Sequence, residues 1–141
     1  MYKKILLAYD GSPDTEVALA QATNLARKFK AELHLVGIAR IALAPTAYAE
    51  PYPHDFLAGE KEQISEALKA ACEDIGKSGL HASATILEGS PSARIAELAH
   101  AMNADLVVIG HTDKGLLARL FEGSVGTELV RNLPCSLLIA T

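Results

Sequence analysis

The sequence has no tryptophan, and aromatic residues make up only 5% of its 141 positions. Its apolar half is mostly alanine, leucine, isoleucine and valine, which suit helices packed on a buried sheet better than aromatic platforms for stacked bases. Basic residues are also few, since 13 Lys and Arg stand against 17 Asp and Glu for a net charge of −4. Non-specific binding to nucleic acid needs clustered basic side chains, so we expect no nucleic acid partner.

Long apolar runs and cysteine frameworks are missing as well. No stretch approaches the roughly twenty apolar residues that span a bilayer, and the apolar run 5–9 is too short for the core of a signal peptide. The two cysteines, Cys72 and Cys135, have neither a disulfide pattern nor metal-ligand spacing. We therefore expect a cytoplasmic protein with a single domain over residues 1–141 and no membrane partner.

The apolar pattern changes its period repeatedly along the chain. Short apolar runs predict buried strands, and helical spacing predicts the segments between them. Ser12 is expected to cap the first helix, with Pro13 in its first position. Residues 40–56 lack periodicity and hold three prolines, which is typical of a long loop. The expected strands are about 4–9, 32–39, 81–87, 105–110 and 136–140, and the expected helices are about 13–28, 57–77, 91–102 and 124–132.

Five strands alternating with four helices predict an α/β fold with a doubly wound parallel sheet and helices on both faces. Such sheets bind ligands beyond the carboxyl ends of their strands. Asp10 directly follows the first strand, and Gly110 ends the fourth. Gly123 and Ser124 open the last helix, whose first N–H groups lack intrahelical partners and lie at the positive end of its dipole. These groups predict an anion site suited to phosphate, although an isolated Gly-Ser pair more often marks an ordinary helix start.

Four segments together resemble the universal stress protein family over essentially the whole chain: 4–12, 104–110, 123–125 and 133–139. In nucleotide-binding members the loop after the fourth strand reads G-x2-G-x9-G-(S/T), and Gly110 and the pair Gly123-Ser124 match that spacing. The resemblance implies a three-layer sandwich of the adenine-nucleotide α-hydrolase-like type with strand order 3-2-1-4-5. It also implies a module that binds ATP or a related adenine nucleotide with Mg²⁺ or Mn²⁺. Such a module acts in stress response or signalling through conformation or partners, with at most very slow ATP hydrolysis.

Carried over to the matching positions, the resemblance implies a nucleotide site but no catalytic or metal-binding side chain. It puts Asp10 near the adenosine and the backbone of Ile38 at the adenine edge. It puts Ile109 and Gly110 beside the ribose and phosphates, with phosphate donors from Gly123, Ser124 and Val125. On the alternative interpretation, Asp10 simply caps the loop before the first helix. Family members commonly dimerise through the last strand, and the apolar edge Ser136 to Ala140 predicts a homodimer of this kind.

Asp113 stands where the family motif has its second glycine. A carboxylate about 4 Å from a phosphate oxygen repels it by about 4 kcal/mol at a surface-like effective dielectric, unless a divalent cation bridges the two. The alternative function is therefore a dimeric regulatory stress protein that binds no nucleotide. A phosphorelay receiver fits less well, because it needs a cluster of acidic residues after the first strand and only Asp10 lies there. A flavodoxin-like protein also fits less well, because aromatic residues that could sandwich a flavin are scarce.

Overall fold

The computed structural model describes residues 1–39, 54–111 and 125–141. Its elements alternate between strands and helices along the chain, as the sequence predicts. The order is β1 (Lys4–Ala8), α1 (Pro13–Phe29), β2 (Glu32–Ala39), α2 (His54–Lys77), β3 (Ala82–Glu88), α3 (Pro91–Ala101), β4 (Leu106–Gly110), α5 (Val125–Asn132) and β5 (Ser136–Ala140). The expected element bounds agree to within a few residues, and the largest difference is that α2 begins at His54 rather than near 57.

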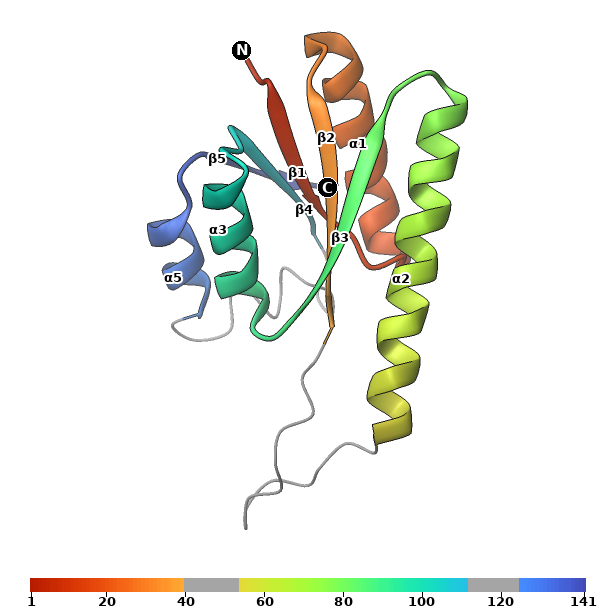
Figure 1. Cartoon of the computed structure of the whole chain (residues 1–141). Helices are drawn as coiled ribbons and strands as arrows, with labels where there is room; N and C mark the ends of the chain where they lie inside the picture. The colour runs from red at the N-terminus through yellow and green to blue at the C-terminus, as the bar shows by residue number, and fades with distance from the viewer. Residues whose placement is uncertain (40–53, 112–124) are drawn as a thin grey trace.

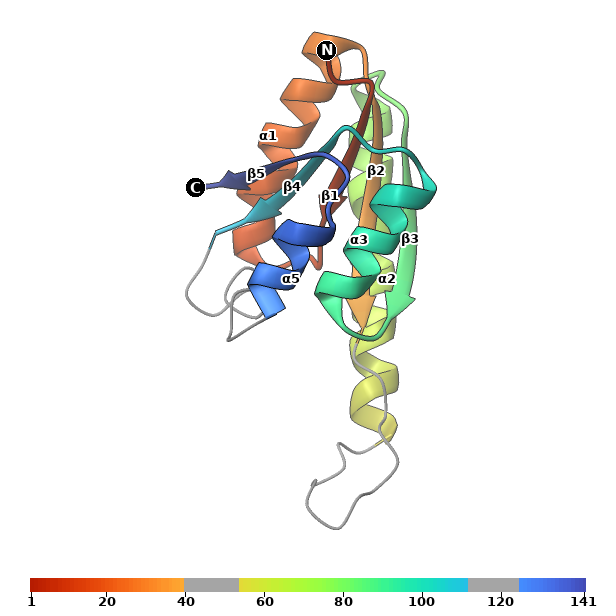
Figure 2. The same ribbon diagram turned by 90° about the vertical axis from the view of Figure 1, so that its left-hand side faces the viewer.

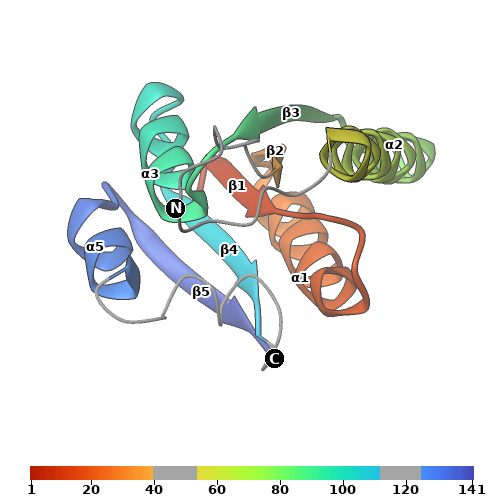
Figure 3. The ribbon, with the colours of Figure 1, turned by 90° about the horizontal axis from the view of Figure 1, so that it is seen from below.

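The five strands form one parallel sheet in the order β3-β2-β1-β4-β5 (Figure 1), which confirms the predicted fold class and strand order. The chain starts in the central strand, moves outward to β3, and then crosses to β4 and β5 on the other side. The strand order therefore reverses between β1 and β4. All five carboxyl ends lie at one edge of the sheet, which faces the viewer in Figure 3.

Helices cover both faces of the sheet, with α1 and α2 on one side and α3 and α5 on the other (Figures 2 and 3). Alternation along β1 divides the core accordingly. Ile5 and Leu7 belong to the cluster under α1 and α2. Leu6 and Ala8 belong to the cluster under α3 and α5. Because both faces are covered, the central strands are almost continuously apolar, which explains their lack of alternation in the sequence.

Close backbone approach decides where α2 packs on the sheet. A Cβ on Gly37 of β2 would collide with Ile64 Cγ2 and would lie 3.0 Å from Leu68 Cδ1. Glycine at this position therefore lets α2 lie directly on β2. The first turns of α2 extend past the carboxyl ends of the strands (Figure 2), so this helix forms a wall beside that edge of the sheet.

Among the described residues, no helix is both long enough and apolar enough to cross a membrane.

Candidate functional site

The loop between β1 and α1 is organised by the carboxylate of Asp10. Asp10 Oδ1 accepts a hydrogen bond from the Ser12 backbone N–H at 2.9 Å, and the buried Thr15 hydroxyl lies 3.2 Å from the same oxygen. Ser12 is the N-cap residue of α1, as predicted, although its side chain makes no capping hydrogen bond. The Asp10 carboxylate holds the loop just before the helix, because it accepts from the N–H of this N-cap residue.

Both of these contacts use Oδ1, and no hydrogen bond from a described residue reaches Asp10 Oδ2. The side chain is partly exposed. Asp10 therefore caps the loop, as the alternative interpretation proposed, and no described residue occupies its second oxygen.

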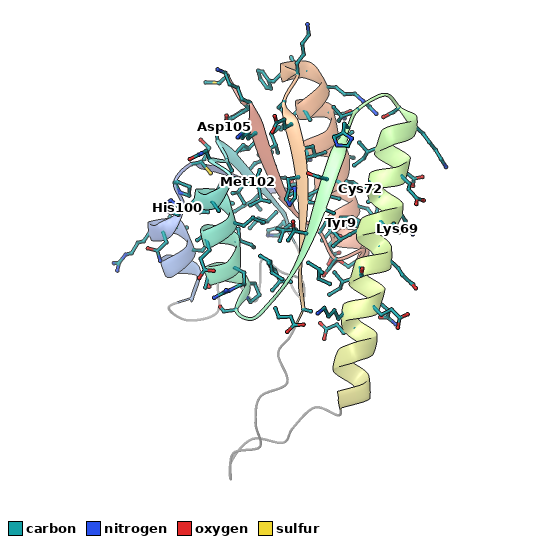
Figure 4. The ribbon with its side chains drawn as sticks, viewed as in Figure 1. Tyr9, Lys69, Cys72, His100, Met102 and Asp105 are labelled. Carbon is teal, nitrogen blue, oxygen red and sulfur yellow. The ribbon has the colours of Figure 1, made fainter. Side chains whose placement is uncertain are left out.

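Tyr9 holds this loop to the first turn of α1. Its ring is 6% exposed, and its hydroxyl donates to Glu16 Oε1 at 2.5 Å. Burial, and then the hydrogen bond to Glu16, raises the pKa of the Tyr9 phenol well above its ordinary value. The phenol therefore stays protonated and keeps donating, which fixes the direction in which the chain leaves β1. Figure 4 shows Tyr9 on the side of the sheet that α2 covers.

The end of β2 lies beside this loop, and its edge toward β1 is not fully paired by the described residues. The Tyr9 N–H donates to the Val36 carbonyl at 2.9 Å, and among the described residues this is the last backbone bond from β1 and its loop to β2. Alternate residues of a parallel strand direct their backbone groups to opposite neighbours. Ile38 therefore directs its N–H and C=O to the same side as Val36, into the space beyond the end of β1. Its side chain is buried, at 7% exposure.

A hollow of about 400 Å³ lies against these two features. One wall is the loop after β1, the floor is the end of β2, and the opposite wall is the first half of α2. A pocket of this size lies within the range of small-ligand sites, roughly 300–1,000 Å³. Its lining residues are Asp10, Gly11, Ser12, Ile38, Glu60, Gln63, Ile64 and Ala67.

Four of the lining residues come from α2 and were not predicted as site residues. They lie at positions 60, 63, 64 and 67, the spacing of one helix face. The sequence did carry a signal, because Glu60 and Gln63 continue the face of Ile64 and Ala67 with polar side chains. Lys61, on the neighbouring face, pairs with Glu88 at the end of β3 at 2.6 Å and ties the wall to the sheet.

The structure brings Asp10 and Ile38 together in this hollow, whereas Ile109 and Gly110 are not among its lining residues. The Ile109 side chain is completely buried in the core under α3 and α5. A Cβ on Gly110 would lie 2.6 Å from the Asp14 carbonyl oxygen. Glycine is needed here because the first turn of α1 packs against the end of β4, which is a different reason from the ligand contact expected from the sequence.

The remaining predicted residues concern the start of α5. Val125 is the first residue of that helix. Gly123, Ser124 and the departing Asp113 lie outside the described residues, as does most of the expected loop 40–56. Within the described part of the chain, no three His, Cys, Asp or Glu side chains gather in a way that could hold a metal ion.

The comparisons with known proteins agree with this architecture. The family model for the universal stress protein family matches residues 1–141. A universal stress protein of Methanocaldococcus jannaschii is 32% identical over 139 residues, which cover 99% of this chain and 82% of that protein.

Solved structures show the same fold. A universal stress protein from Lactobacillus plantarum superposes with a TM-score of 0.78 at 22% identity, covering 99% of this chain and 98% of that one. A universal stress protein from Archaeoglobus fulgidus, solved in complex with dAMP, superposes with a TM-score of 0.68 at 20% identity, covering 99% and 98%. With a family model matched along its whole length and a relative above 30% identity, this chain belongs to the universal stress protein family.

Proposed function

We propose that this protein is a cytoplasmic stress-response or signalling module that binds ATP or a related adenine nucleotide. It acts through conformation or partner binding rather than through fast catalysis. The observation that carries this proposal is the hollow at the carboxyl ends of β1 and β2. It is lined by Asp10 and by Ile38, whose backbone edge toward β1 is not paired by any described residue. Ligands of doubly wound sheets bind at this edge.

The backbone of Ile38 suits the edge of an adenine base. Adenine presents the N6 amino donor beside the N1 acceptor, and a strand residue presents C=O and N–H groups on one side. Guanine presents the reverse order, with the O6 acceptor beside the N1–H donor. A backbone edge that pairs with adenine would leave two unsatisfied groups against guanine, and such mismatches discriminate strongly between ligands.

The charges around the hollow suit the nucleoside part of a nucleotide. Among the described residues, its lining contains the carboxylates of Asp10 and Glu60 and no Lys or Arg. Carboxylates accept hydrogen bonds from ribose hydroxyls, as in dinucleotide-binding folds, but they repel phosphate oxygens. We therefore orient the phosphates away from the hollow, toward Gly110 and the start of α5, where Gly123 and Ser124 precede the first helical residue.

A divalent cation fits this arrangement only together with phosphates. Mg²⁺ is usually held by one or two carboxylates plus substrate phosphate oxygens, and no hydrogen bond from a described residue reaches Asp10 Oδ2. Mg²⁺ or Mn²⁺ bound there would neutralise phosphate charge. The dAMP complex of the A. fulgidus protein supports an adenine nucleotide as the ligand class.

Calorimetry with matched nucleotides tests the proposal. We expect AMP and ATP to bind and GMP and GTP to bind at least tenfold more weakly, because the base edge is reversed. Asp10→Asn keeps an acceptor for the Ser12 N–H but removes the charge, and should weaken ATP binding most when Mg²⁺ is present. Asp74→Asn, at a carboxylate that is 78% exposed on α2, is the control for lost charge. Absence of binding at millimolar ATP would leave the alternative function, a regulatory protein without nucleotide.

We further propose a homodimer formed through β5, the outer strand Ser136–Ala140. Ile139 is 38% exposed although it lies in a strand, and an open apolar strand edge favours pairing with a second copy. Light scattering at tens of micromolar should give the dimer mass. Ile139→Lys should shift it to the monomer, whereas Val130→Lys, at an exposed apolar residue of α5, should not. A monomeric wild type would contradict the proposal.

A further inference from the structure

A second hollow lies at the opposite edge of the sheet, near the amino ends of β1, β2 and β3. It is an open hollow of about 290 Å³ between the sheet and the last turn of α3. Since α3 passes over the middle of the sheet, the first residues of β2 and β3 on this face are left without a covering helix. The residues that line this hollow are Lys4, Glu32, Leu33, His34, Ser83, Thr85, Leu98, Ala101, Met102 and Asn103.

A cluster of three polar side chains forms its floor. His34 on β2 is in register with Ser83 on β3, so both side chains point to the same face, and Thr85 follows two residues later. His34 Nδ1 lies 2.6 Å from Ser83 Oγ, and His34 Nε2 lies 2.7 Å from Thr85 Oγ1. Both ring nitrogens are therefore engaged, which holds the imidazole in one orientation.

This cluster offers one hydroxyl proton to a ligand whichever tautomer is present. A neutral imidazole donates from one nitrogen and accepts at the other. The hydroxyl that accepts from the ring keeps its own O–H proton free to donate. Burial lowers the pKa of His34, which favours this neutral form near pH 7. The floor of the hollow therefore presents one O–H donor, from Ser83 in one tautomer and from Thr85 in the other.

The positively charged side chain of Lys4 lines the same hollow as this cluster. Lys4 is the first residue of β1 and is in register with Glu32. Nevertheless, in the described part of the chain no carboxylate lies within 4.0 Å of the Lys4 ammonium. An O–H donor and a neighbouring ammonium together suit a carboxylate. The Glu32 carboxylate on the rim adds a negative charge, so a ligand with one negative charge fits better than a multiply charged phosphate.

The wall opposite the polar floor is apolar. It consists of Leu98, Ala101 and Met102 from the end of α3. Leu98 and Met102 are partly buried and pack at the margin of the core under α3 and α5. Figure 4 shows Met102 at the end of α3 that lies toward the amino ends of the strands. Methionine adapts its shape readily to a bound apolar group.

We propose that this hollow binds a small organic monocarboxylate with a compact apolar body. The carboxylate would lie between the Lys4 ammonium and the hydroxyls of Ser83 and Thr85, and the body would pack on Leu98 and Met102. A polar sheet face alone would predict only bound water. The hollow shape and the apolar wall opposite the donors are features of a ligand pocket. The site is separate from the nucleotide hollow, because the two lie at opposite ends of the strands.

Chemical-shift mapping with three probes tests this assignment. Benzoate has the charge and the apolar body, benzyl alcohol has the body without the charge, and inorganic phosphate has charge without the body. We expect saturable shifts with benzoate at millimolar concentration, centred on the amides of His34, Ser83 and Thr85 and on the Met102 methyl group. Equal binding of benzyl alcohol or phosphate would overturn the proposed ligand class, and shifts centred elsewhere, or none, would overturn the site.

Matched variants test the residues. Lys4→Gln removes the proposed partner of the carboxylate and should weaken benzoate binding by about fivefold, the size expected for a half-exposed ion pair. Lys3→Gln removes the same charge one residue away, at an exposed position, and should leave the affinity unchanged. Thr85→Val combined with Ser83→Ala removes both hydroxyls, and should also weaken binding. Equal effects of the two lysine variants would show that only net charge matters and would overturn the site.

Discussion

Replacing Gly110 with alanine should destabilise this protein, because the added Cβ would clash with the backbone of the first turn of α1. The added Cβ would lie 2.6 Å from the Asp14 carbonyl oxygen and 3.1 Å from its carbon. Ordinary contact begins at 3.4 Å, so the first turn of α1 would have to retreat by about 0.8 Å. That turn is held by the Thr15 N–H bond to the Ser12 carbonyl and by the contacts of Asp10. Backbone held in this way cannot swing aside as a flexible side chain could.

Overpacking of this kind costs about 1–3 kcal/mol, and we expect the upper half of that range because the obstructing atoms are backbone. For a chain of this size each kcal/mol corresponds to roughly 4 °C, so the Tm should fall by about 8–12 °C. Urea unfolding followed by circular dichroism gives the free energy of unfolding, and a thermal scan gives the Tm.

Gly76→Ala is the matched control. Gly76 lies in α2, and an added Cβ there has no heavy atom within 4 Å. Alanine at an open helix position should stabilise the protein by up to about 1 kcal/mol. The two substitutions add the same methyl group and should act in opposite directions. If Gly110→Ala unfolds at the same urea concentration as the wild type, the packing explanation of this glycine is wrong.

Three further predictions follow from local geometry. Gly11 and Gly79 have almost the same φ, +84° and +86°, but only at Gly11 would an added Cβ crowd a neighbour, Ala67 Cβ at 2.7 Å. Both alanine variants should lose about 1 kcal/mol of unfolding free energy from the left-handed backbone, and Gly11→Ala should lose at least 1 kcal/mol more in urea unfolding. Equal losses would contradict the close approach of α2. Burial lowers the pKa of His34 in the folded protein. The stability that its neutral ring contributes should therefore be complete above the ordinary pKa of 6.5 and decline as the pH falls through the lower folded value. An NMR titration that places the pKa of His34 at or above 6.5 would refute this. Burial raises the pKa of the Cys72 thiol. Iodoacetamide at pH 8 should therefore alkylate Cys72 more slowly than it alkylates the thiol of a small unstructured peptide. Equal rates by mass spectrometry would count against this burial.

Much of the fold could be predicted because each element has a local cause. Leu106–Gly110 is apolar throughout, as a strand covered on both faces must be. Pro13 starts α1, and the acidic Asp14 and Glu16 fall in its first turn, where the helix dipole favours them. The early start of α2 could not be predicted, because residues 54–56 carry no apolar period that separates helix from loop.

The candidate site was predicted only in part. Asp10 and Ile38 were predicted because the resemblance to the family names positions at strand ends, and strand ends can be recognised in the sequence. The α2 wall was missed because Glu60 and Gln63 are polar and lie on a helix that looks amphipathic by itself. Their place opposite Asp10 depends on how α2 packs on β2.

The sequence alone determined the alternation of strands and helices, the membership in the family and the edge of the sheet where a ligand would bind. These follow from periodicity and motifs, which act over a few residues at a time. Tertiary structure alone decided which atoms meet: that the first turn of α1 lies on Gly110, that α2 forms the wall opposite Asp10, and that His34 stands between two hydroxyls at the far end of the sheet. Such contacts join residues tens of positions apart, and packing selects them only once the whole core has formed.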